Sequence, residues 1–398
     1  MLRADADFRH HTTVLFGAGL LMFVLFAAVG LTAVFDGYWD DLLAVSVRRA
    51  VRWQPAAVGF FLGAEGTPSF SQFALHNRLF YHAARVFPGS PELFWRLVRF
   101  SVALLLAVVL MAFVLAVCRE FGVIAAWVTY AQIITSYSLM VFASSYSWFG
   151  FLQFLPFVMT FMWYGRTRTP GARWFFHAVL ALAVFVKALC GYAFLSSIVL
   201  SCALAIAYHE LKRDSPWRTV LWRMTQGAAA GVAGFVAAFA LTAWQASVLL
   251  QSGSRAWHAV MAPATVRTFG YDPNSTLMGD LRTYIAYFTK NGQLWIFADV
   301  LIGLMFLHFV LARPEAGSVL SRTTRLWLAL IVGALAASLS WNTLAWGHMR
   351  YHLHVDHISF FIPFNLVVFL FNGYLISTAA ERIGPPPKDL GSPLAAGR

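Results

Sequence analysis

Three carboxylates follow directly on the first apolar run of the sequence. The stretch FDGYWDDLL, residues 35 to 43, carries Asp36, Asp40 and Asp41 in a chain with only 17 acidic residues among 398. On a helix Asp36 and Asp40 share a face, whereas Asp41 points elsewhere. Crowded carboxylates raise one another's pKa, which makes one of them a better general base near neutral pH. The pair also suits a divalent cation such as Mg²⁺ or Mn²⁺, and aspartates favour the solvated first turn of a helix. These three interpretations stay open.

A second group of ionisable residues precedes the last apolar run. The stretch GHMRYHLHVDH, residues 347 to 357, holds four of the twelve histidines. Two of them stand at i and i+4, a workable helical metal pair. An arginine among histidines suits a phosphate or pyrophosphate better, and we favour that interpretation. The alternative is that the rings merely lie at lipid-headgroup depth. The candidates are His348, Arg350, Tyr351, His352, His354, Asp356 and His357.

Two further basic residues complete the candidate site. Lys187 closes the apolar run VFVKALCGYAF, where an ion is costly and therefore a functional candidate, although its side chain could instead reach the headgroups. Arg78 lies in a long, arginine-rich and aromatic segment between the first two apolar runs. Both residues are candidates for binding the phosphate of a substrate.

The elements that position these residues follow from composition. The chain is 60% hydrophobic and 12% charged, about half the charge of a soluble domain. Apolar runs of the length that crosses a bilayer recur, which predicts an all-α, multi-pass membrane protein. The net charge of +12 is scattered between these runs, which favours membrane lipids over nucleic acid as the partner. About ten spans are expected, near 13–34, 101–118, 121–142, 147–164, 174–189, 191–209, 224–249, 295–312, 326–341 and 358–376.

The orientation follows from the positive-inside rule. Arginine and lysine recur in the short loops of one side, together with both termini, so that side is predicted to be cytoplasmic. The other side carries outer loops at about 35–100, 250–294 and 342–357. The first apolar run exceeds a usual signal-peptide core, so we expect it to remain as an anchor. Residues 1–380 are expected to form one transmembrane domain, followed by a disordered tail at 381–398.

This arrangement resembles the GT-C class of membrane glycosyltransferases. The likeness rests on the acidic residues after the first span and on HNRLFYHAARVFPGSPELFWRLVRFSVALLLAVVL, which is similar to the amphipathic end of the first loop in that class. The resemblance in architecture covers most of residues 13–376. The chain also resembles uncharacterised bacterial members of this class. The chain departs from the class in its small number of spans and in having no large soluble C-terminal domain.

The resemblance implies a sugar transfer at the outer face of a bacterial inner membrane. A polyprenyl-phosphate-linked sugar would be the donor, and an envelope glycan, lipid or protein the acceptor. Asp36, and after it Asp40, would take the proton of the acceptor hydroxyl, with inversion at the sugar. Arg350, the neighbouring histidines and Lys187 would hold the leaving phosphate. The sugar itself is left open.

Three other functions compete with this one. A polysaccharide polymerase or ligase also handles lipid-linked sugars, but it needs no acidic cluster after the first span. A lipid or solute transporter, or a flippase, would show ionisable residues at mid-bilayer and two related halves, whereas this sequence shows no repeat and places most of its ionisable groups at the outer edge. A membrane metalloprotein would place its histidines on separate helices. We rank them in that order behind the transferase.

Overall fold

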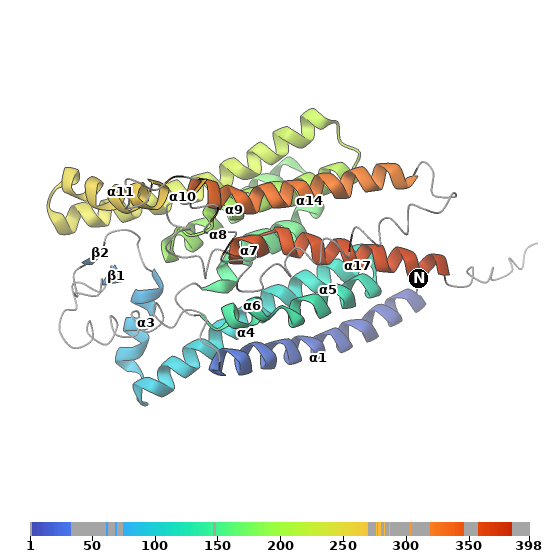
Figure 1. The fold of residues 1–398 in the computed structure, drawn as a ribbon, viewed down its shortest axis with the longest axis horizontal. Coiled ribbons are helices and arrows are strands. Elements are labelled where there is room, and N and C mark those ends of the chain that lie inside the picture. The colour runs from blue at the N-terminus through green and yellow to red at the C-terminus, as the bar shows by residue number, and fades with distance from the viewer. Residues whose placement is uncertain are drawn as a thin grey trace, which may run out of the picture.

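The computed structural model is almost entirely helical (Figure 1). It describes residues 2–32, 61–62, 68–69, 75–145, 149–269, 319–345 and 357–383, together with positions 276, 278, 279, 282, 286 and 303. Within this part of the chain, six helices are long and apolar enough to cross a membrane. They are α4 (Pro91–Phe121), α8 (Pro170–Cys190), α9 (Leu195–Lys212), α10 (Trp217–Leu250), α14 (Val319–Leu344) and α17 (Phe364–Ile383).

Shorter elements fill the spaces between these helices. An antiparallel pair of two-residue strands joins Phe61 to Ser69. The further elements are α1 (Leu2–Thr32), β1 (Phe61–Leu62), β2 (Pro68–Ser69), α3 (Leu75–Val86), α5 (Val123–Thr135), α6 (Tyr137–Ala143), α7 (Gly150–Trp163), η2 (Tyr164–Arg166), α11 (Gly253–Phe269) and η4 (His357–Phe361).

Local sequence explains where several helices begin and end. Ser90 and Thr169 cap α4 and α8, each accepting a hydrogen bond from the backbone N–H three residues on, and each is followed by proline. Gly122 alone joins α4 to α5 with φ of +91°, a conformation that glycine adopts most easily. These caps and this turn depend only on neighbouring residues, so they define the helix ends without contacts from other helices.

One expected span is interrupted. The run at 121–142 was predicted as a single helix, but it divides into α5 and α6 at Ser136, whose ψ is 95°. Serine and threonine side chains compete with helical hydrogen bonds, and Thr135 and Ser136 are adjacent here. The expected span at 295–312 and most of the outer loop at 250–294 lie outside the described residues. The described residues therefore confirm a helical membrane protein without fixing the number of spans.

The helices form a bundle with two distinct ends. α4 packs against α1, α5 and α7, α9 packs against α7, α10 and α14, and α17 packs against α5. One end, here called the loop end, carries β1, β2, α3 and α11, and the N-terminus lies at the opposite end (Figure 1). The opposite end, here called the arginine end, includes the connections 164–169 and 213–216.

The outer surface of the bundle is apolar. Along α10 the large side chains of Val232, Val236 and Trp244 are exposed, as is Leu182 on α8. A water-soluble protein rarely exposes so continuous an apolar surface. We conclude that lipid covers these helices.

Candidate functional site

At the loop end, helix α3 packs onto the end of α8. Leu75 of α3 contacts the cluster formed by Ala188 and Leu189 of α8 with Ala238 of α10. Further along α3, Phe80 stacks on Phe149 with ring centroids 5.6 Å apart. The aromatic, amphipathic sequence of α3 thus buries one face against the transmembrane bundle, and this places its polar residues next to the C-terminus of α8.

Lys187 lies in the last turn of α8 and is 2% exposed. Its ammonium donates hydrogen bonds to the carbonyl oxygens of Gly191 at 2.6 Å and Ala193 at 3.1 Å. A cation at a helix C-terminus is favoured by the helix dipole, and these bonds compensate part of the cost of burying it. The side chain therefore shapes the connection between α8 and α9. That it also binds a substrate phosphate stays a prediction.

His76 was missed by the sequence reasoning, although it occupies the same site. It is 1% exposed and packs edge-on against both Phe80 and Phe149, with ring centroids 6.4 and 5.5 Å away. Both of its ring nitrogens are buried without a hydrogen-bond partner among the residues that the structure describes. Burial, and after it the positive charge of Lys187, lowers the pKa of His76 to about 3. The imidazole is therefore neutral at pH 7, and its buried polar atoms are a cost to folding.

Arg78 follows His76 by two positions on α3, so the two side chains leave different faces of that helix. It is half-buried, and burial lowers the pKa of its guanidinium. The structure thus brings Lys187 and His76 together, while Arg78 lies on another side of the same element. Only the pattern HNR in the first-loop ending could have drawn attention to His76.

The other predicted site residues cannot be compared with this geometry. Asp36, Asp40, Asp41, His348, Arg350, Tyr351, His352, His354 and Asp356 lie outside the described residues. His357 begins η4, but its side chain is likewise outside them. Among the side chains that the structure describes, no three His, Cys, Asp or Glu residues are grouped so as to hold a metal ion. A divalent cation at Asp36 and Asp40, which lie outside these residues, stays a prediction.

Two described helices end next to the undescribed candidate segments. α1 ends at Thr32, four residues before Asp36, and α14 ends at Leu344, four residues before His348. Since α1 starts at the end that carries the N-terminus, its C-terminal end faces the loop end (Figure 1). η4, which begins at His357, packs against α14.

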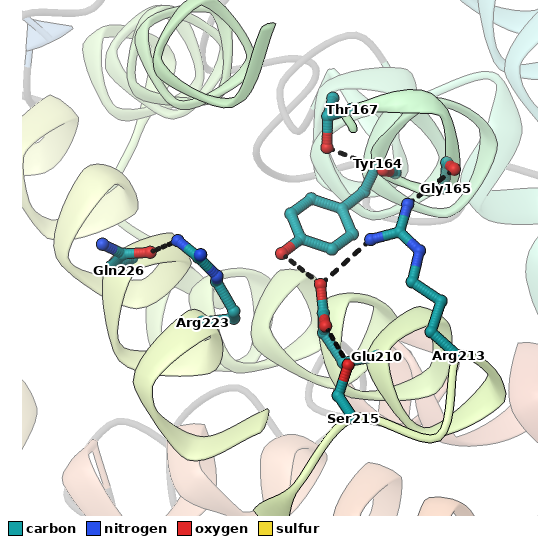
Figure 2. A network of polar contacts seen from close by, with 8 residues as sticks. All are labelled: Tyr164, Gly165, Thr167, Glu210, Arg213, Ser215, Arg223 and Gln226. Carbon is teal, nitrogen blue, oxygen red and sulfur yellow. Dashed lines mark hydrogen bonds and ion pairs between the residues drawn. The ribbon is translucent and has the colours of Figure 1, made fainter. Parts of the chain in front are cut away.

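A separate polar network lies at the arginine end (Figure 2). Glu210, near the end of α9, accepts hydrogen bonds from Tyr164 at 2.9 Å and Ser215 at 2.6 Å, and Arg213 donates to it at 3.0 Å. Arg213 also donates to the carbonyl oxygen of Gly165 at 2.7 Å. The carboxylate is thereby held by three donors, and the network ties the two connections together. It is therefore a structural clamp.

Comparison of the chain with protein-family models, with curated proteins and with solved structures gave no match.

Proposed function

We propose that the protein is a GT-C-type glycosyltransferase that moves a sugar from a polyprenyl-phosphate carrier to an envelope glycan, lipid or protein acceptor. The observation that carries the proposal is the buried ammonium of Lys187 at the loop end, next to α3 of the first loop. A buried cation acts through a low-dielectric medium, so its field is felt more strongly than that of an exposed charge. A site that releases an anionic phosphate needs such a field.

The reaction assigns a part to the main predicted residues. The acceptor hydroxyl attacks the anomeric carbon while the bond from that carbon to the phosphate oxygen breaks. Asp36, or else Asp40, takes the hydroxyl proton, and the polyprenyl phosphate leaves with the electron pair. Arg350 and the neighbouring histidines contact that phosphate. Because the hydroxyl attacks from the side opposite the leaving group, the anomeric centre is inverted.

Lys187 has a different part in this proposal. Its hydrogen bonds to the carbonyl oxygens of Gly191 and Ala193 hold the ammonium against the connection after α8. It therefore orients that connection and contributes positive potential to the leaving phosphate, which Arg350 and the neighbouring histidines contact. In this proposal the loop end lies on the outer face of the membrane and both termini are cytoplasmic, as the arginine-rich connections favour.

The test is native mass spectrometry of the purified protein with a polyprenyl-phosphate-sugar mixture. We expect the wild type to retain a lipid-linked sugar and Arg350→Ala to lose it about tenfold. Asp36→Asn should retain the donor but transfer its sugar to envelope acceptors 10²–10⁴-fold more slowly, on the order of a lost general base. Arg96→Ala is the matched control, because Arg96 is exposed and pairs with Glu92 of its own helix.

The outcomes separate the competing functions. Donor retention with unchanged transfer in both Asp36→Asn and Asp40→Asn would contradict the base assignment. Failure of any lipid-linked sugar to bind, with all variants equal to wild type, would overturn the transferase and favour a transporter.

A further inference from the structure

A cavity of about 540 Å³ lies between α8 and α10, near the first turn of α8. Pocket volumes of this size hold small molecules or headgroups. The residues that matter for its chemistry are Pro170, Arg173, Trp174 and His177 of α8, with Arg223 and Gln226 of α10. Three alanines of α10 line the rest. The cavity is thus basic on one side and apolar on the other.

The positive charge in this cavity is not neutralised by neighbouring acids. Within the part of the chain that the structure describes, neither Arg173 nor Arg223 forms an ion pair, and the lining contains no carboxylate. Arg223 donates one hydrogen bond, to the side chain of Gln226 at 2.8 Å (Figure 2). Glu210, which is drawn with Arg223 in Figure 2, is already held by Tyr164, Arg213 and Ser215. The two guanidinium groups are therefore available to bind an anion.

Two further features point to an anionic ligand. His177 lines the cavity, and both of its ring nitrogens are buried without a hydrogen-bond partner among the described residues. The cavity also lies at the N-terminus of α8, where Pro170 occupies the first turn and the helix dipole is positive. Arginine forks match phosphate oxygens in geometry as well as in charge.

The apolar side of the cavity identifies the source of the phosphate. Trp174 is 75% exposed, and α10 presents exposed apolar side chains such as Val232 and Val236 towards lipid. A free phosphate would leave this surface uncovered, whereas a lipid acyl chain would run along it. We propose that the cavity binds the phosphate headgroup of an anionic membrane lipid, with its chains packed against α10.

This lipid site is distinct from the proposed catalytic end. α8 has 21 residues and so measures about 30 Å, and Lys187 stands near its other end. Lipid binding in the cavity therefore does not depend on sugar transfer at the loop end. Its test needs only the purified protein and lipids of known composition.

The experiment compares lipids that share acyl chains and differ in charge. The protein is purified in detergent, and equimolar phosphatidylglycerol and phosphatidylcholine are added before native mass spectrometry. We expect the wild type to retain phosphatidylglycerol about tenfold more than phosphatidylcholine, and the double variant Arg173→Gln/Arg223→Gln to lose that preference. Arg218→Gln is the matched control, because it removes the same charge from an exposed position of α10 outside the cavity lining.

A second variant guards against loss of folding. Ala233→Trp would fill the cavity from an exposed position of α10 and keep every charge. It should also abolish the preference, while its thermal unfolding stays like that of wild type. Equal retention of the two lipids by wild type, or an equal loss in Arg218→Gln, would overturn the proposal. Displacement of phosphatidylglycerol by an equal concentration of inorganic phosphate would show an anion site without lipid recognition, which would also overturn it.

Discussion

The Nζ atom of Lys187 donates to the carbonyl oxygen of Gly191 at 2.6 Å, so the last turn of α8 is tied to the connection that follows it. This bond makes a buried cation part of the fold itself. The contribution of Lys187 to stability can be measured by unfolding, independently of any contribution that it makes to substrate binding.

Replacing Lys187 with methionine should destabilise the protein. The variant keeps the volume but leaves the carbonyl oxygens of Gly191 and Ala193 without this donor, which costs about 2 kcal/mol or more. Unfolding in mild detergent, followed by tryptophan fluorescence, measures the loss. The control is Lys212→Met, whose half-exposed side chain pairs with Glu120 and should cost less than about 1 kcal/mol. Equal losses in the two variants would contradict the structural assignment of Lys187.

His76 should make the protein sensitive to mild acid. The unfolded chain protonates this imidazole near its ordinary pKa of 6.5, whereas the folded protein resists protonation down to about 3. The unfolding free energy therefore has its full value above pH 6.5 and falls as the pH drops below it, by about 1.4 kcal/mol per pH unit. His76→Phe should remove this loss between pH 7 and pH 5. His82→Phe, at an exposed position of the same helix, should leave the pH profile of wild type intact.

The network around Glu210 should behave as one unit. Glu210→Ala leaves Arg213 and the buried hydroxyl of Tyr164 without their shared acceptor, and we expect a loss of about 3 kcal/mol. Tyr164→Phe should cost about 1 kcal/mol, and the double variant should cost less than the sum. A thermodynamic cycle from unfolding in detergent checks this, and strict additivity would speak against a network. For comparison, Glu92→Ala breaks only an exposed pair with Arg96.

Close packing of α8 against α10 depends on Gly234. A Cβ atom at this position would overlap the backbone carbonyl of Ala181, and backbone cannot move aside as a flexible side chain does. Gly234→Ala should therefore push the helices apart and cost about 1–3 kcal/mol. Gly171→Ala, where the added Cβ meets open space, should be neutral or slightly stabilising. Thermal unfolding of both variants in the same detergent decides between these outcomes.

The sequence by itself determined the class of the protein and most of its helices. Apolar runs long enough to cross a bilayer can satisfy their backbone only as helix there, so α1, α4, α7, α8, α9, α10, α14 and α17 each overlap an expected span. The caps Ser90 and Thr169, each followed by proline, explain why α4 and α8 begin ten and four residues before the spans expected at 101–118 and 174–189. The division at Ser136 escaped prediction, because an apolar run does not reveal how a hydroxyl side chain competes for backbone hydrogen bonds.

Only the tertiary structure decided which polar residues meet. Lys187 was a candidate from the sequence, but its carbonyl partners became visible only when the connection after α8 was in place. The charge of Lys187 acts on His76 because α3 packs onto α8, although the two residues are more than 100 positions apart, and no local pattern encodes such packing. Arg173 and Arg223 had counted merely as charges that orient the chain. The packing of α8 on α10 turns them into the lining of one cavity, because helix packing joins residues by face and depth, which sequence spacing alone does not specify.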